Sequence, residues 1–306
     1  MNIVATIIPI FAVIVLGWFA RWKGFMPPAF IEPANRLVYY LALPAMLFLS
    51  ISKASLRTEF DIVVLVITLL SILTVFAIAW GVGSTIRVRR EQFGTFIQCS
   101  FHGNIGYIGL AVAYYFLGTE GFIRAGIIAG FIIILQNFLA VVILQLCSDN
   151  IPVRGNKLTI VWKILGNPVI LAAVAGMLFS ITEVPMPLVI DRSLGILSAL
   201  AFPMALLLIG ASLSFELMRL RTLLVFTTDI MKLILLPGFG FALYRLFGLM
   251  PQDYLPGLIL LASPTAVITY VMAKEMNGDT DLAVAAVSTS TILSAVTFSV
   301  WLNIAG

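Results

Sequence analysis

Two apolar segments of the chain contain residues that would interrupt a helix and that also carry hydrogen-bonding groups. The first segment holds Gly103, Asn104 and Gly106, and the second holds Ser263-Pro264-Thr265. Glycine destabilises a helix by roughly 1 kcal/mol relative to alanine, and proline removes a hydrogen bond and clashes with the preceding turn. A helix that resumes after such a break presents free backbone N–H groups and a partial positive charge. Two such ends facing one cavity would bind an anion without any basic side chain.

Polar side chains near the two segments could complete an anion site. The candidates, which carry hydroxyl or amide groups, are Asn104, Ser263, Thr265, Thr269, Gln136 and Asn137. The expected ligand is a small organic anion, most simply a carboxylate, and we expect no metal site and no cofactor. The alternatives are structural, because closely spaced glycines also let helices approach, Pro264 also makes a simple kink, and amides also bond neighbouring helices.

Three titratable side chains fall within apolar segments and are candidates for ion coupling. Asp229 and Lys232 are three positions apart, on one helical face and near enough to pair, and His102 lies beside the first break. Charges inside a membrane usually mark transport pathways or proton relays, so we predict coupling to protons. The competing prediction is Na⁺ held by carbonyl groups of the broken helices and by hydroxyls of the Ser288–Ser294 cluster. The structural alternatives are a neutralised Asp229–Lys232 pair, a lysine reaching an interface, and a histidine packed among its neighbours.

The segments that must position these residues are long and apolar. The chain is 61% hydrophobic and 10% charged, whereas a soluble domain is about 45–50% apolar and about 25% charged. A helix needs about 20 mostly apolar residues to cross a bilayer. Ten stretches meet this requirement, at 3–21, 33–52, 61–84, 92–117, 121–146, 159–180, 187–210, 222–247, 253–275 and 280–304. The predicted fold class is therefore an all-α polytopic membrane protein with no soluble domain, embedded in a lipid bilayer.

A repeated phrase indicates that the chain was built by duplication. The run from Tyr40 to Pro44 resembles the run from Ala199 to Pro203, at an offset of 159 residues (203 minus 44). The same offset places Asn104 on Ser263, so the two helix-breaking segments lie at matching positions of the two copies.

The two halves, 1–150 and 151–306, would hold five spans each. An odd number of spans makes the second half enter the membrane in the opposite sense, so the repeats are inverted. We therefore expect the fourth and ninth spans to be discontinuous helices that cross near the midplane of the membrane. This arrangement is typical of secondary transporters.

The basic residues predict the orientation in the membrane. Twelve Lys and Arg residues fall in the odd-numbered connections between spans and only five in the even-numbered ones. This bias places the odd connections in the cytoplasm and both termini outside, in a multi-pass protein of the cell (inner or plasma) membrane. The net charge of +4 follows from these loops, and we expect no nucleic-acid partner.

An enzyme and a passive channel are the main alternatives to a carrier. The chain has 1 histidine, which excludes the His-Glu-x-x-His site of a metalloprotease. An aspartyl-type site would need a second acid facing Asp229, and the sequence offers no obvious partner. We therefore predict that the protein is not an enzyme. A passive anion channel, or a sensor built on a transporter fold, remains as the alternative function.

The chain resembles the auxin efflux carrier family in its short microbial form, whose members include malate and malonate permeases. The matching motifs are Leu41-Ala-Leu-Pro44, Gly103–Leu110, Ser263–Ala266, Tyr270–Asp279 and Ser288–Ser294. The resemblance implies ten helices with crossed fourth and ninth spans, separate scaffold and transport domains, homodimers, and a substrate site lined by Asn104 and the prolines or glycines of the crossing. In this family a proline often follows the Gly-Leu of the fourth span, and here that position is Ala111.

Overall fold

The computed structural model describes residues 3–53, 61–147, 168–182, 184–219 and 222–306, and every element in these ranges is a helix. The longer helices are α1 (Ile3–Trp22), α2 (Pro28–Leu37), α3 (Leu43–Ser52), α5 (Ile62–Thr85), α6 (Arg90–Phe101), α7 (Leu110–Cys147), α9 (Pro168–Thr182), α10 (Leu188–Ser198), α11 (Ala201–Ser212), α12 (Thr222–Ile230), α13 (Leu236–Leu246), α14 (Pro251–Ala262), α15 (Ile268–Glu275) and α16 (Thr280–Ala305). Short π-helical turns η1 (Val38–Ala42), η2 (Ile105–Gly109) and η4 (Met231–Leu235) precede α3, α7 and α13, and a 3-10 turn, η3 (Leu217–Arg219), precedes α12.

Seven helical stretches in the described ranges are long and apolar enough to cross a membrane. They are Ala5–Trp22, Pro28–Ser52, Ile62–Thr85, Ile105–Cys147, Leu188–Ser212, Leu223–Leu246 and Thr280–Ala305. The prediction of a polytopic, all-helical membrane protein is confirmed at this level. The stretch predicted at 159–180 lies partly outside the described residues, and its described part is α9.

The ends of several helices are set by local chemistry. Asp61 caps α5, since its carboxylate accepts hydrogen bonds from the backbone N–H groups of Val63 and Val64 at 2.8 and 3.2 Å. Asp279 caps α16 in the same way through Leu282. Gly118 lies inside α7 with φ 72° and ψ −164°. This positive φ interrupts the helix, and glycine adopts it without a steric penalty. The long run from Ile105 to Cys147 is therefore bent into two pieces at Gly118.

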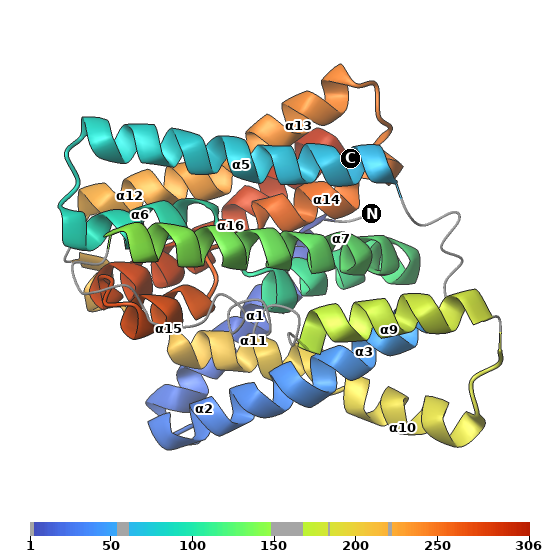
Figure 1. Ribbon diagram of the computed structural model, residues 1–306. Helices are drawn as coiled ribbons and strands as arrows, with labels where there is room; N and C mark the ends of the chain where they lie inside the picture. Colours follow the sequence, from blue (N-terminus) through green and yellow to red (C-terminus); the bar gives the residue numbers. More distant parts are fainter. Residues whose placement is uncertain (1–2, 54–60, 148–167, 183, 220–221) are drawn as a thin grey trace.

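The helices form two groups (Figure 1). In one group α1 packs along α11 and α3 packs along α9, with α2 and α10 beside them. The backbones of α1 and α11 approach closely at glycines: a Cβ atom at Gly17 would overlap the carbonyl oxygen of Leu207, and one at Gly210 would overlap that of Ile14. The Arg21 guanidinium also donates to the carbonyl oxygen of Ala211, which ties the end of α1 to α11.

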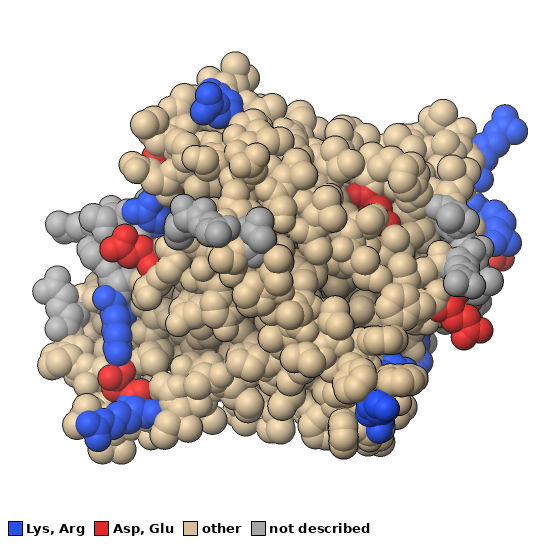
Figure 2. Space-filling view, turned by 180° about the vertical axis from the view of Figure 1, so that it is seen from behind, with Lys and Arg blue, Asp and Glu red and all other residues tan. Residues whose placement is uncertain are grey.

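The second group consists of α5, α6, α7 and α12 to α16. Here α5 packs on α6, α13 and α14, and α12 packs on α6 and α16. Figure 2 shows that charged side chains gather mostly toward the two ends of the molecule, leaving a broad band that is nearly free of charge. Such a band is what the hydrocarbon core of a bilayer requires of a surface that faces lipid.

Candidate functional site

Two helices of the second group are interrupted at the places where the sequence predicts breaks. Helix α6 ends at Phe101, and the chain is extended at His102 before the helix resumes as η2 at Ile105. Helix α14 ends at Ala262, Ser263 is extended, and α15 begins five residues further on. The glycine and proline content explains both interruptions, because neither residue type supports the interior of a helix.

The two interruptions contact each other through their backbones. Gly103 and Thr265 form an isolated antiparallel bridge. The N–H of Asn104 donates to the carbonyl oxygen of Pro264 at 2.6 Å, and the N–H of Ala266 donates to that of His102 at 2.9 Å. We call residues 102–104 and 263–267 the crossover. It joins segments that lie far apart in the sequence at the centre of the second helix group.

Gly103 is required at the crossover for steric reasons. A Cβ atom at this position would lie 2.5 Å from the hydroxyl oxygen of Ser263 and 3.1 Å from Cε of Lys232. The Ser263 hydroxyl is held in place because it donates to the carbonyl oxygen of Leu260 at 2.7 Å. The close approach of the two segments therefore depends on the missing side chain.

Asn104 has one side-chain group in use and one free. Its Oδ1 accepts a hydrogen bond from the backbone N–H of Tyr107 at 3.4 Å, which caps the helix that begins after the break. Its Nδ2 is buried and has no hydrogen-bond partner among the described residues. Because Oδ1 faces a backbone donor, the orientation of the amide is fixed and the free group is a donor. A buried free donor is suited to an acceptor ligand such as a carboxylate.

The carbonyl ends of α6 and α14 are covered by side chains. Gln136 donates from Nε2 to the carbonyl oxygen of Phe101 at 3.0 Å, and the Thr265 hydroxyl donates to that of Cys99 at 3.1 Å. On α14, the Lys232 ammonium donates to the carbonyl oxygen of Leu261 at 2.7 Å. A cation at the C-terminal end of a helix is stabilised by the helix dipole.

Lys232 and Asp229 do not form the ion pair that their spacing allows. Lys232 is fully buried and points at the end of α14, whereas Asp229 is 2% exposed and neither of its carboxylate oxygens has a hydrogen-bond partner in the described part of the chain. The helical spacing places them on one face, but the lysine reaches a different acceptor. The structural alternative considered from the sequence, a neutralised Asp229–Lys232 ion pair, is therefore wrong.

His102 and Thr269 lie in or beside the crossover, Gly106 follows it on η2, and Asn137 is not seen to contact it. The His102 ring is 4% exposed and stacks on Phe101, with the ring centroids 6.1 Å apart, and its Nδ1 has no partner in the described chain. The Thr269 hydroxyl donates to the carbonyl oxygen of Ala266. Gly106 is half-buried next to Leu43. Asn137 is half-buried, one position after Gln136, and no contact with the crossover is seen for it.

Ser290 contacts the crossover, although the sequence did not single it out from the neighbouring hydroxyl residues. Its hydroxyl accepts a hydrogen bond from the backbone N–H of Thr265 at 3.0 Å and donates to the carbonyl oxygen of Val287 at 3.3 Å. Ser288 accepts one from the backbone N–H of Ser214. The only sequence signal for this role was the run of hydroxyl residues from Ser288 to Ser294, which does not indicate which hydroxyl faces the break.

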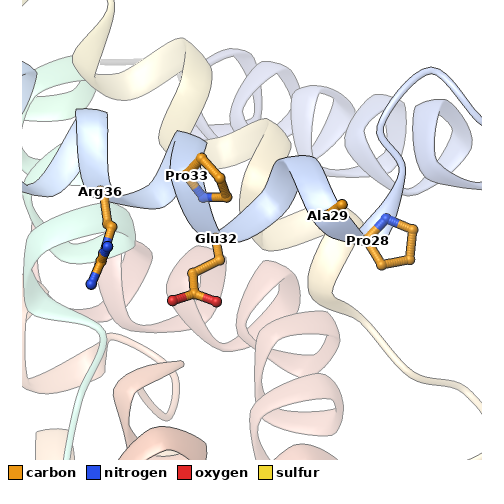
Figure 3. Close-up of a pocket in the computed structure, with 5 residues that line it drawn as sticks. All are labelled: Pro28, Ala29, Glu32, Pro33 and Arg36. Atoms are coloured by element: carbon orange, nitrogen blue, oxygen red, sulfur yellow. The ribbon is translucent and has the colours of Figure 1, made fainter.

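The two described surface pockets lie away from the crossover. One is a groove along α2, where the side chains of Glu32 and Arg36 extend from the same side of the helix (Figure 3). The other lies at the end of α3, beside an ion pair between Lys53 and Asp191 at 2.5 Å. The crossover itself is in the protein interior, where the side chains of Asn104, Ser263 and Thr265 are buried.

Two interrupted helices that meet in the interior of a helical membrane protein are typical of secondary transporters. The chain is a member of the family described as membrane transport protein, whose family model matches residues 2–150 and 152–302. This membership confirms the resemblance to the auxin efflux carrier family.

Relatives match over nearly the whole chain. The protein is 24% identical over 298 residues to an uncharacterized transporter of Methanocaldococcus jannaschii, with 94% of each chain covered. It is 26% identical over 310 residues to the "Putative malonate transporter" of Rhizobium meliloti, covering 97% of this chain and 93% of the relative. It is 23% identical over 308 residues to an uncharacterized transporter of Escherichia coli K12, covering 98% of this chain and 97% of the relative.

Proposed function

We propose that the protein is a secondary active transporter that moves a small organic anion across the cell membrane by alternating access. The observation that carries this proposal is the buried crossover, where Asn104 presents a free amide donor beside the start of a helix. Helix starts and unpaired N–H donors together favour a negatively charged ligand. Because the site is buried, its ligand reaches it only when the helices around it part, which is what alternating access provides.

The proposed architecture has ten spans in two inverted repeats, 1–150 and 151–306. It is supported by the two interruptions at matching positions of the halves and by the break at Gly118, which divides the 43-residue stretch Ile105–Cys147 into parts of two spans. The resemblance further implies that the protein forms homodimers.

The substrate class we propose is a carboxylate, and a dicarboxylate is the first candidate. The name of the Rhizobium meliloti relative mentions malonate, and that relative is 26% identical to this chain. Residues in and beside the crossover would bind the anion from several sides: Asn104 through its free amide donor, and Ser263, Thr265 and Thr269 by turning their hydroxyls away from the backbone carbonyls to which they now donate. Gln136 is placed beside them at the end of α6. Counterflow of labelled malonate into proteoliposomes loaded with organic acids would distinguish a carrier from a passive channel, because only a carrier exchanges substrate.

Replacing Asn104 with alanine is expected to lower the affinity for the anion roughly tenfold or more. The lost hydrogen bond to a charged partner is worth about 1.5–3 kcal/mol. The matched control is Asn303→Ala, which removes the same amide from an exposed position of α16. Affinity would be measured by thermal stabilisation in a titration of malonate and related acids, since a ligand stabilises the state that it binds. If both variants bound the acid like the parent chain, the anion site would lie elsewhere.

Cysteines introduced near the two ends of the chain, at Thr6 and Ile304, are expected to react with membrane-impermeant reagents from the extracytoplasmic side. The reason is the excess of basic residues in the odd-numbered connections. The background would carry serine at Cys99 and Cys147, the two cysteines of the chain. Labelling intact cells and inverted vesicles in parallel gives the comparison. Reaction of both positions from the cytoplasm alone would contradict the proposed orientation.

A further inference from the structure

Asp229 is a buried carboxyl group without a neutralising partner. It lies on α12, is 2% exposed, and neither of its oxygens accepts a hydrogen bond within the described chain. An isolated carboxylate in a low-dielectric interior is strongly destabilised unless it is paired or neutralised. A protein that keeps such a group in its core therefore has a reason to supply a cation to it.

Among the described residues, none is seen to form an ion pair or a hydrogen bond with the Asp229 carboxylate. Helix α12 packs against α6, α16, η3 and η4. The titratable groups at this end of α6 are Cys99 and His102, which directly follows the helix, and Lys232 on η4 is bonded to the end of α14 instead. On α16 the charged residue is Asp281, which is an exposed acid, and Arg219 of η3 precedes the start of α12.

Two more unpartnered oxygens lie on the helices that enclose Asp229. They are Oε1 of Gln98 on α6 and the hydroxyl of Thr291 on α16, both buried and without a partner in the described residues. Helices α6, α12 and α16 contact one another pairwise. Carboxylate, amide and hydroxyl oxygens are the ligands that hard cations prefer.

Contacts of the neighbouring residues bring these segments of α6, α12 and α16 together. Cys99, which follows Gln98, is close enough to Asp229 to interact with it electrostatically. The carbonyl oxygen of Cys99 accepts from the Thr265 hydroxyl, and the N–H of Thr265 donates to Ser290, the neighbour of Thr291. The same contacts place these segments of α6 and α16 next to the crossover.

We propose that Asp229, Gln98 and Thr291 form a site for one monovalent cation, H⁺ or Na⁺, between α6, α12 and α16. The two ions share one chemistry, since each neutralises the carboxylate: a proton by binding to it, Na⁺ by taking the surrounding oxygens as ligands. The site is separate from Asn104, whose free donor suits an anion. If the protein is a transporter, this site would bind the coupling ion beside the substrate. Only this coupling role rests on the proposed function; the binding of the cation does not.

The test measures the stability of the purified protein without any substrate, so that its result does not depend on the proposed function. Thermal unfolding in detergent would be followed across pH in the absence of Na⁺, and across Na⁺ concentration at alkaline pH with choline replacing Na⁺. The variant is Asp229→Asn, which keeps the shape and removes the charge. The control is Asp281→Asn, an exposed acid on α16.

For a proton site, the parent chain and Asp281→Asn are expected to lose stability as the pH rises, because the buried carboxyl loses its neutralising proton. Asp229→Asn is not expected to show this loss. For a Na⁺ site, Na⁺ is expected to raise the unfolding temperature of the parent chain and of Asp281→Asn but not of Asp229→Asn. If the parent chain responds to pH and to Na⁺, and Asp229→Asn responds to neither, then H⁺ and Na⁺ compete for the site. A parent chain insensitive to both ions, or an Asp229→Asn variant that keeps the full response, would overturn the proposal.

A second variant covers the case in which Asp229→Asn does not fold. Thr291→Val replaces a buried hydroxyl by a methyl group of similar size and is expected to weaken the stabilisation by Na⁺. For the proton arm, the infrared band of a protonated carboxylic acid in the parent chain is expected to disappear at alkaline pH. An unchanged Na⁺ response in Thr291→Val, together with no titrating acid band, would also overturn the proposal.

Discussion

Replacing Gly210 with alanine is expected to prevent the chain from accumulating as folded protein. A Cβ atom at this position would overlap the carbonyl oxygen and carbonyl carbon of Ile14 and the backbone nitrogen of Trp18. These are backbone atoms of α1, so no side-chain rotation relieves the contact, and α1 and α11 would have to separate. Overpacking a well-packed core costs typically about 1–3 kcal/mol, and a clash between two backbones belongs at or above the upper end.

The measurement is the yield of monodisperse protein after detergent extraction, together with its unfolding temperature. Gly195→Ala is the matched control, because it lies on the neighbouring helix α10 and a Cβ atom there would have nothing within 4 Å. The control is expected to behave like the parent chain. Equal yields and unfolding temperatures for both variants would show that α1 and α11 are not in close contact.

Replacing Lys232 with methionine is expected to flatten the pH dependence of transport. The ammonium is fully buried and bonded to the end of α14, beside the crossover. In the proposed mechanism the helices part to open the site, this contact would change, and an amine in that place could then release or take up a proton. Methionine has a similar length and volume but cannot be protonated, so uptake by the variant should no longer respond to pH.

Uptake into proteoliposomes driven by an imposed pH gradient would be compared with uptake driven by an imposed Na⁺ gradient. Lys274→Met is the control, since that lysine lies in the last turn of α15 and is exposed. The parent chain and the control are expected to respond to the pH gradient. Uptake that follows only Na⁺ and is unaffected by Lys232→Met would leave Lys232 with a purely structural role at the end of α14.

The sequence predicted the helix interruptions well because their causes are local. Glycine and proline destabilise a helix wherever they stand, so Gly103 and Pro264 indicated both breaks without knowledge of the fold. The long apolar stretches were equally readable, since the bilayer imposes their length and composition. The offset between the halves then indicated that the two breaks belong together.

The contacts inside the site could not be predicted, because they depend on which helices become neighbours. Spacing placed Asp229 and Lys232 on one helical face, yet Lys232 bonds to a carbonyl group 29 positions away in the sequence. Ser290 was one hydroxyl in a run of several, and only the structure shows that it accepts from Thr265. The π-helical turns before α3 and α13 also had no signal that we could read from the residues.

The bridge between Gly103 and Thr265 has a consequence for how new specificities can arise in this scaffold. The hydrogen bonds that hold the two interruptions together run between backbone atoms, from Asn104 to Pro264 and from Ala266 to His102. They place few demands on side chains beyond the small size of Gly103. If the crossover binds the substrate, as we propose, substitutions at neighbouring positions can change which molecule is recognised while the crossing of the chain stays intact. Main-chain hydrogen bonds would then hold the crossing together, and the side chains around it would determine selectivity.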